Sequence, residues 1–263
     1  MPKFTLLQIV QDILSDMSSD TVNSIDDTEE ATQVAQIVQS TYNSMLTNRN
    51  WPHTKRTIQL TAYADGTKPT HMYLPQNVKE LVTVSYNKQK HTSPRILYEP
   101  VRFKENDDFL RLANLNDSTQ ATTQLVTDPS GIQLLIKNNK APDFWTSFDD
   151  TTMVFDSYDS TIDSTIQTSK TQVLAYITPV FSMTDGYTPD LPEEAFMALI
   201  EEAKSRAMFR LKATQDIKAE QESTRQQKWL SRKSWRTHGG IRYENYGRKS
   251  RKGDRDPTFR NEN

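Results

Sequence analysis

Clustered carboxylates are the first candidates for chemistry in this sequence, because closely spaced oxygen ligands can hold Ca²⁺. Five aspartates lie between residues 149 and 163, namely Asp149, Asp150, Asp156, Asp159 and Asp163. A calcium loop usually also needs a glycine at its turn, and this stretch has none. We therefore interpret these side chains as solvated loop acids and predict no metal ligands here.

Two glutamate pairs, Glu193/Glu194 and Glu201/Glu202, could supply a general acid and a general base. Their places on a helical pattern favour a different role, in which the first pair complements the helix dipole and the second faces solvent. His53 has no serine or aspartate partner at a diagnostic spacing, so we interpret it as a structural or surface histidine. The chain has no cysteine and no phosphate-loop, G-x-G-x-x-G, H-E-x-x-H or G-x-S-x-G motif. We predict that it is not an enzyme and that it has no catalytic, cofactor-binding or metal-binding residues.

Charge is divided unevenly along the chain. Its 263 residues carry 32 Lys and Arg against 34 Asp and Glu, a net charge of −2. Residues 1–200 have a net charge of −10, and residues 201–263 a net charge of +8. Ten basic side chains lie between Arg225 and Lys252, where Glu244 is the only acid. Four of the seven glycines follow position 238, so this end is interpreted as a flexible basic arm.

Aromatic side chains are interleaved with these cations, at Trp229, Trp235, Tyr243 and Tyr246. Cations that neutralise phosphates and rings that stack on bases would bind nucleic acid. The same mixture would also anchor a protein interface, where Trp, Tyr and Arg dominate. A third alternative is a purely solubilising tail, which we disfavour because such tails rarely place four large aromatics among ten cations.

Hydrophobic spacing predicts the helices that must position these residues. Apolar residues at steps of three and four predict helices at 4–17 and 27–48, the second with Asp27 as N-cap and Glu30 as capping-box partner. The same period returns after Pro189. No Pro or Gly occurs from Glu193 to His238, which predicts one long helix through the first C-terminal tryptophan and as far as the second. Its polar second half must project or lie against another chain.

Between the helices the pattern is that of strands. Alternation and turn signals predict strands at 54–62, 71–74, 78–86, 95–103, 152–155 and 172–178, a short helix at 106–115 and a hairpin at 125–136. Asp, Ser and Thr dominate residues 156–172, interpreted as a mobile loop or a projecting β arm.

The predicted fold class is therefore α+β: a helical bundle of two N-terminal helices plus one long C-terminal helix, with an inserted mixed β domain and an extended basic C-terminal arm. The predicted domains are a discontinuous bundle at 1–51 and 190–236, the β-rich domain at 52–189 and the arm at 237–263.

The order of four sequence stretches resembles that of the head-to-tail adaptor (connector, or tail tubular) proteins of short-tailed bacteriophages. The first stretch is YNSML (42–46) followed by NWP (50–52), and the second is YLPQNV (73–78). The third, PDFWTSFDD (142–150) followed by VFDSY (154–158), is the most distinctive. The fourth is LPEEAF (191–196), which opens a long helical pattern ending in QKWL (227–230). Together they cover most of the chain.

The resemblance implies a helical bundle with an inserted β domain, assembled as a ring of commonly twelve copies below the portal. It implies a structural virion protein that bridges the portal to the tail nozzle and continues the DNA channel. The implied partners are the portal protein, the tail nozzle protein and neighbouring copies of the chain, while genomic DNA passes without specific binding. The implied location is the neck of the virion after assembly in the host cytoplasm.

The resemblance also implies which residues make these contacts, by their position along the chain. The arm of such proteins typically reaches the portal, so the implied portal-binding residues are Trp229, Arg232, Lys233, Trp235, Arg236, Arg242, Tyr243, Tyr246, Arg248 and Lys249. The implied tail or subunit interface lies in the β region, at Trp145, Asp149, Asp150, Phe155, Asp156 and Tyr158. An acidic body suits a DNA channel, because like charge shortens the residence of DNA on its wall.

Two other functions stay open. A nucleic-acid-binding protein would use the basic arm, whose net charge from Arg225 to Lys252 is +9, and its binding would weaken steeply with salt. A hydrolase acting on cell-wall sugars would need two carboxylates about 5–10 Å apart in a cleft, and nothing in the sequence selects such a pair. No apolar run approaches the ~18 residues of a membrane span, so a soluble protein without a membrane partner is expected.

Overall fold

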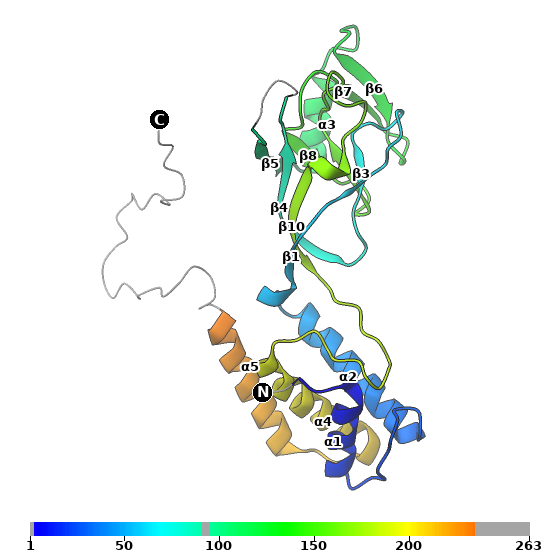
Figure 1. Ribbon diagram of the computed structural model, residues 1–263, viewed down its shortest axis with the longest axis vertical. Coiled ribbons are helices and arrows are strands. Elements are labelled where there is room, and N and C mark those ends of the chain that lie inside the picture. Colours follow the sequence, from blue (N-terminus) through cyan, green and yellow to red (C-terminus); the bar gives the residue numbers. More distant parts are fainter. Residues whose placement is uncertain (1–2, 91–94, 235–263) are drawn as a thin grey trace, which may run out of the picture.

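The computed structural model describes residues 3–90 and 95–234, and its elements gather at the two ends of an elongated molecule (Figure 1). One end holds four helices, α1 (Leu6–Asp16), α2 (Glu29–Thr47), α4 (Phe196–Lys212) and α5 (Ile217–Ser234). The other end holds the strands together with α3 (Asn106–Asn114). We call these ends the helical region and the sheet region.

The two N-terminal helices confirm the prediction from apolar spacing. The Thr5 hydroxyl accepts the Gln8 N–H at 3.3 Å while the Gln8 side chain accepts the Thr5 N–H at 3.0 Å, so a capping box begins α1. The predicted cap of α2 is wrong by one residue, because the Thr28 hydroxyl accepts the Ala31 N–H at 3.1 Å. The Asp27 carboxylate is engaged instead by the backbone of the preceding turn.

The prediction of one long C-terminal helix is wrong, because the chain reverses after α4. Ala213 adopts a left-handed conformation with φ of 52° that ends α4. The Asp216 carboxylate then accepts the Ala219 N–H at 3.1 Å and begins α5. Along the returning helix, the Ser223 hydroxyl donates to the Glu202 carboxylate at 2.7 Å. The polar second half therefore packs on α4. Two helices joined by a reversal show the same apolar period in the sequence as one continuous helix.

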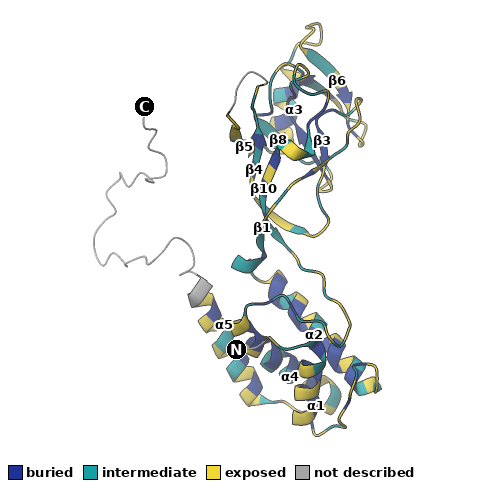
Figure 2. Cartoon of the chain, in the orientation of Figure 1, coloured by how far each residue is buried: buried dark blue, intermediate teal, exposed yellow. Residues whose placement is uncertain are grey.

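The four helices enclose one hydrophobic cluster, the helix core (Figure 2). Tyr42 and Phe196 are among its largest fully buried side chains. Trp51 lies at the edge of the core nearest the sheet, and Leu230 of α5 lies near it, since Arg49 contacts both. The predicted domain limits stay a prediction.

The sheet region is built on one mixed sheet of eight strands, in the order β1-β10-β4-β5-β8-β9-β3-β2. Its strands are β1 (Lys55–Ile58), β2 (Thr61–Ala62), β3 (His71–Tyr73), β4 (Val78–Asn87), β5 (Tyr98–Phe103), β8 (Phe144–Thr146), β9 (Thr152–Phe155) and β10 (Thr171–Ile177). All neighbouring strands are antiparallel except β5 and β8. Because β1 and β2 end the order yet follow each other along the chain, the sheet curls back on itself.

A separate hairpin packs with this sheet and confirms the strongest turn prediction. It consists of β6 (Thr123–Thr127) and β7 (Gln133–Lys137). Val126, Leu134 and Ile136 of the hairpin join Phe109 of α3 and the inner residues of the sheet in a second cluster, the sheet core. The short helix predicted at 106–115 is confirmed as α3.

The predicted fold class is wrong in its architecture. The described residues form an α+β structure with five α helices, and the curled eight-stranded mixed sheet is its dominant element. A three-helix bundle with an inserted β domain is not what they form. Hydrophobic periodicity locates single elements, but it does not show that β1 pairs with β10, which joins residues as distant as Lys55 and Tyr176.

Residues 156–172 do not project from the sheet region. Ser157, Tyr158 and Ile166 are buried, and Ser157 forms a parallel bridge with Lys137 at the end of β7. A short turn of helix, η2 (Thr168–Lys170), then leads into β10. The alternative of a projecting β arm is wrong, because a few apolar residues anchor an otherwise polar stretch.

Candidate functional site

The residues predicted to bind the portal begin on the last described turns of α5. Trp229 lies there with 47% of its surface exposed. Arg232 and Lys233 follow on the same helix. The remaining predicted portal residues lie outside the described residues, namely Trp235, Arg236, Arg242, Tyr243, Tyr246, Arg248 and Lys249.

The end of α5 is held in place by Arg49, which follows α2. The Arg49 guanidinium donates to the Leu230 carbonyl oxygen and, at 3.3 Å, to the Ser231 hydroxyl. It also lies 4.5 Å from the centre of the Trp51 ring, within cation–π range. A cation at the last carbonyls of a helix complements the helix dipole. The basic C-terminal segment therefore starts from a fixed position next to the junction of the two regions.

Polar contacts hold the two regions together at this junction, which we call the waist. Lys79 of β4 donates to the carbonyl oxygens of Leu46, Thr47 and Arg49, at 2.8 to 3.1 Å. Three carbonyl oxygens at or just after the end of α2 thus accept hydrogen bonds from one ammonium group of the sheet. A single side chain satisfies acceptors that a helix end otherwise leaves to solvent.

His53 belongs to the waist. Its Nε2 lies 2.8 Å from the Asp190 carbonyl oxygen, and its buried Nδ1 has no hydrogen-bond partner among the described residues. Burial lowers the pKa of the imidazole, and the nearby Asp190 offsets only part of this effect. The Asp190 carboxylate in turn accepts from Arg56 at 2.9 Å. These contacts join β1 to the strand-to-helix connection.

The residues predicted for a tail or subunit interface are largely structural within the sheet region. Phe155 is fully buried, and Tyr158 is 7% exposed with its hydroxyl donating to Gln124. Asp149 accepts the N–H groups of the two threonines that lead into β9. Asp150 beside it has a left-handed backbone with φ of 58°. Their role in an interface stays a prediction.

Trp145 is the partly exposed aromatic of this group. Its ring meets that of Phe103 edge-on, with 4.9 Å between the centroids. Phe103 is 52% exposed. The pair therefore reaches the surface where β5 and β8 run parallel, although sequence reasoning singled out only the tryptophan.

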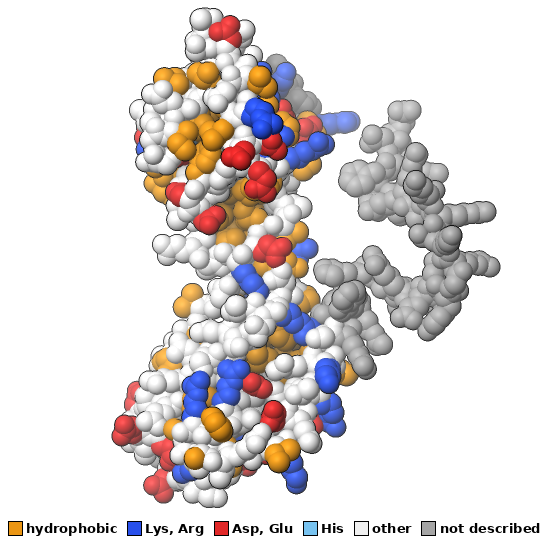
Figure 3. Space-filling model, turned by 180° about the vertical axis from the view of Figure 1, so that it is seen from behind, with side chains coloured by type: hydrophobic (Ala, Val, Ile, Leu, Met, Phe, Trp, Pro, Cys, Tyr) orange, Lys and Arg blue, Asp and Glu red, His pale blue; other side chains and the backbone are white. Residues whose placement is uncertain are grey.

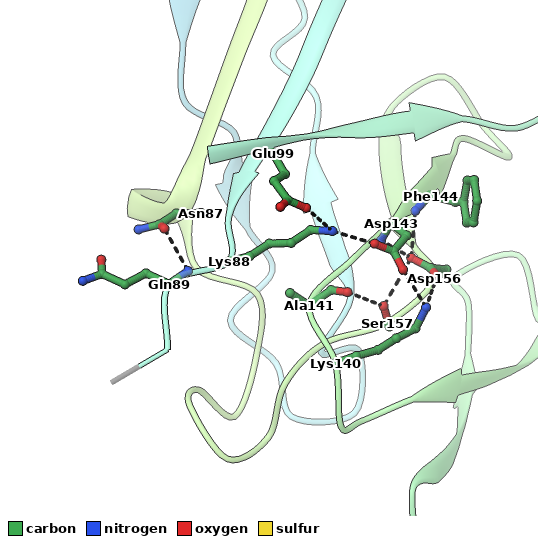
Figure 4. Close-up of polar contacts among 10 residues, drawn as sticks. All are labelled: Asn87, Lys88, Gln89, Glu99, Lys140, Ala141, Asp143, Phe144, Asp156 and Ser157. Atoms are coloured by element: carbon green, nitrogen blue, oxygen red, sulfur yellow. Dashed lines mark hydrogen bonds and ion pairs between the residues drawn. The ribbon is translucent and has the colours of Figure 1, made fainter. Parts of the chain in front are cut away.

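Asp156 is the predicted residue that the structure connects most extensively (Figure 4). Its Oδ1 accepts the N–H groups of Asp143 and Phe144, both at 2.9 Å. Lys140 lies 3.4 Å from its other oxygen and 2.8 Å from the Asp143 carboxylate. Asp156 thereby fixes the start of β8, on which Trp145 lies.

The same ionic cluster continues to β4 and β5. Lys88, which follows β4, contacts the carboxylates of Asp143 and, at 3.1 Å, Glu99. Although burial acts to raise the pKa of Asp143, hydrogen bonds from Lys140 and Lys88 lower it below its usual range. Burial acts to lower the pKa values of Lys88 and Lys140, but their acidic partners raise both above the usual range. These pKa shifts favour the charged forms of all three groups, which the ion pairs between them require.

Replacing Asp156 by alanine is expected to lower the free energy of unfolding by about 2–3 kcal/mol, because two backbone N–H groups lose their acceptor. Asp156→Asn keeps an acceptor oxygen and is expected to lose about half as much. Urea denaturation followed by circular dichroism measures both. The matched control is Asp117→Ala, which removes a carboxylate from an exposed turn and is expected to cost less than about 1 kcal/mol. Equal losses for Asp156 and Asp117 would contradict the assignment.

Apolar side chains also reach the surface of both regions. Figure 3 shows such side chains on the sheet region beside acidic and basic groups. The most exposed of these side chains are Leu115, Ile96, Leu125, Phe103, Leu97 and Tyr73 in the sheet region, Phe209, Ile217 and Trp229 in the helical region, and Val180 in the connection between β10 and α4. Such residues are candidates for contacts with other chains.

Comparison with models of known protein families finds no match, and comparison with curated proteins finds none either. Within the described part of the chain, no three His, Cys, Asp or Glu side chains are grouped so that they could hold a metal ion. Among the described helices, none combines the length and the apolar character needed to cross a membrane.

Proposed function

We propose that this chain is a structural virion protein, a head-to-tail adaptor that forms a ring between the portal and the tail nozzle and continues the DNA channel. The observation that carries the proposal is the fixed end of α5. Arg49 holds this end beside the waist, and an exposed Trp229 precedes a segment rich in Arg, Lys, Trp and Tyr. Cationic and aromatic side chains on a fixed base suit docking on a protein partner.

The charge distribution supports the same proposal. Residues 1–200, which carry a net charge of −10, include the whole sheet region. A collar of such chains would repel DNA from its wall. In this arrangement the helical region lies next to the portal, the sheet region is directed to the tail nozzle, and exposed apolar residues meet neighbouring copies. A ring of twelve copies is the proposed assembly.

Deleting residues 235–263 is expected to abolish docking on the portal ring while the body stays folded. The deletion should begin after α5, because a cut at residue 226 would also remove Leu230 from the helix core. Co-sedimentation with purified portal rings measures docking, and circular dichroism checks the fold. A control variant replaces the basic residues from Arg236 to Lys252 by glutamine and keeps the aromatic side chains. Undiminished docking of the truncated chain would refute the proposal.

A nucleic-acid-binding protein is the second candidate, favoured by the net charge of +9 from Arg225 to Lys252. Contacts with phosphates release counterions, so the affinity for bare duplex DNA should fall steeply between about 50 and 200 mM salt. Fluorescence anisotropy of labelled DNA measures this slope, with the chain truncated at 234 as control. The adaptor proposal expects weak binding that does not depend on sequence.

A further inference from the structure

The outer edge of β6 is an unprotected strand edge at the end of the molecule far from the helical region (Figure 1). Natural sheets guard such edges with charged residues, prolines, bulges or very short strands. The terminal strands of the large sheet follow this rule, since β1 carries Lys55 and Arg56 and β2 has only two residues. Residues 118–127, which include all of β6, contain no charged residue, no proline and no glycine.

The register of the hairpin shows which backbone groups this edge presents. Asp128 N–H donates to the Ile132 carbonyl at 2.8 Å, and Asn138 N–H donates to the Thr122 carbonyl at 2.9 Å. Residues of an antiparallel strand alternate between bonding the partner strand and pointing away from it. The even-numbered residues of β6 therefore bond β7, while Thr123, Leu125 and Thr127 direct their N–H and C=O groups outward.

The outward groups have little to bond within the described chain. Thr123 N–H donates to the Gln120 carbonyl at 3.0 Å, and no hydrogen bond to the outward groups of Leu125 or Thr127 is found among the described residues. By contrast, the far side of β7 is covered, since Asn116 donates to the Leu135 carbonyl at 2.7 Å and Tyr158 N–H to the Lys137 carbonyl at 3.0 Å. β6 is thus the open side of the hairpin.

The hairpin that carries this edge is firmly held. Val126 is 1% exposed in the sheet core, and the Gln124 side chain accepts a hydrogen bond from Tyr158. In the turn, Asp128 pairs with the buried His71 of β3 at 3.0 Å. A strand that docks on β6 would meet a preformed template and would order little of this chain.

We propose that the β6 edge pairs in antiparallel fashion with the β6 edge of a second copy of this chain. The outward residues read Thr123, Leu125, Thr127, a pattern that is the same in both directions. A two-fold axis at Leu125 therefore sets leucine opposite leucine and each Thr123 opposite the Thr127 of the partner subunit. Threonine pairs and apolar pairs stabilise neighbouring strands, and an uncharged edge meets itself without repulsion.

The hydrogen bonds of this pair are accounted for. Leu125 exchanges both of its bonds with its counterpart, and Thr127 N–H reaches the carbonyl of the opposite Thr123. The Thr123 N–H remains with Gln120. Leu125, 56% exposed in the single chain, becomes covered by its counterpart. A strand from another protein could use the same bonds, but the reversible Thr-Leu-Thr pattern favours a second copy.

This pairing goes beyond the proposed ring. Copies in a single ring share one direction along its axis, whereas a two-fold pair opposes two sheet regions. The pair therefore belongs to the free chain and must open before both copies can enter one ring. Its test uses the free protein without any portal, so its failure and the failure of the adaptor proposal are separate results.

The absence of cysteine from the chain allows a test by site-directed crosslinking. In a hydrogen-bonded antiparallel pair the opposite Cα atoms lie about 5.5 Å apart, which is within the range of a disulfide. Leu125→Cys is expected to form a disulfide-linked dimer under mild oxidation. Thr127→Cys alone is expected to stay unlinked, because the two copies of residue 127 are offset by about 13 Å. Mixing Thr123→Cys with Thr127→Cys is expected to restore the link.

Sedimentation equilibrium supplies the second measurement. The unmodified chain is expected to show a concentration-dependent dimer, and Leu125→Lys is expected to weaken the association at least tenfold without unfolding, because this side chain is exposed. Thr119→Cys, on an exposed turn next to the edge, serves as the collision control. A monomer at all concentrations up to about 100 μM would overturn self-pairing. Crosslinking at residue 125 no faster than at residue 119 would also overturn it.

Discussion

Replacing His71 by alanine is expected to lower the free energy of unfolding of the sheet region by about 3–5 kcal/mol, because it leaves a buried carboxylate without its partner. The His71 side chain is 0% exposed and that of Asp128 is 5% exposed, with 3.0 Å between Nε2 and Oδ1. Asp128 also accepts the N–H of Ser130, so this pair ties the turn of the hairpin to β3. Hydrogen exchange at Val126 and Leu134 measures the loss.

A conservative variant separates the hydrogen bond from the packing of the ring. His71→Gln keeps an N–H donor that can reach Asp128, and it is expected to lose no more than about half as much stability as His71→Ala. The edge-on contact between the imidazole and Tyr63, with 5.9 Å between the centroids, is lost in both variants. If glutamine were as destabilising as alanine, the hydrogen bond to Asp128 would not be the main contribution.

The same histidine makes stability depend on pH. Burial lowers the pKa of His71 below its usual value near 6.5, and the hydrogen bond and charge of Asp128 oppose this only in part. The charge of Lys68 lowers the pKa of His71 further, and the charge of Asp149 raises it. Because the unfolded chain takes up the proton first, the contribution is fully present above about pH 6.5 and is lost as the pH falls below that value. His71→Gln should show a smaller decline than the unmodified chain in denaturation measured from pH 8 to 5, because the buried His53 still contributes.

Replacing Trp51 by alanine is expected to lower the free energy of unfolding of the helical region by about 3–5 kcal/mol, the cost of emptying a large aromatic site. Trp51 is 4% exposed, and its indole N–H donates to the Met45 carbonyl at 3.0 Å. Its ring also supports the Arg49 guanidinium. The variant should therefore release the end of α5 as well, seen as faster hydrogen exchange around Leu230.

The control for this prediction is Trp51→Phe. Phenylalanine keeps most of the packing but leaves the Met45 carbonyl without its donor, so a loss of about 1–2 kcal/mol is expected. Urea denaturation followed by the helical circular dichroism signal compares the variants. An unchanged exchange rate at Leu230 in Trp51→Ala would show that Arg49 holds α5 without help from the indole.

Local patterns in the sequence predict the elements well. The apolar stripe of α1 and the Asp-Pro-Ser-Gly turn between β6 and β7 depend on residues within one helix or one hairpin, and the structure confirms both. The reversal after α4 escaped prediction for a physical reason. Ala213 adopts a left-handed conformation that is usually taken by glycine. The first two buried residues of α5, Ala219 and Ser223, are small or polar, and the large apolar Leu230 follows only near its end.

The contacts that organise the predicted site were beyond local patterns. Lys88 and Glu99 join Asp143, which contacts Asp156, only because β4, β5 and β8 become neighbours in the sheet. No spacing in the sequence signals this meeting, since long-range strand order depends on the whole sheet. Position along the chain was enough to select Asp156 but not to show that it holds the backbone at the start of β8.

Lys79 has a mechanical consequence. Its ammonium group joins the first residues of the ten-residue strand β4 to the carbonyl groups at the end of the nineteen-residue helix α2. The strand and the helix are therefore linked end to end along the molecule. Force applied at the tip of the sheet would be transmitted into the helix axis through a charged joint, and high salt should soften that joint more than it softens either half.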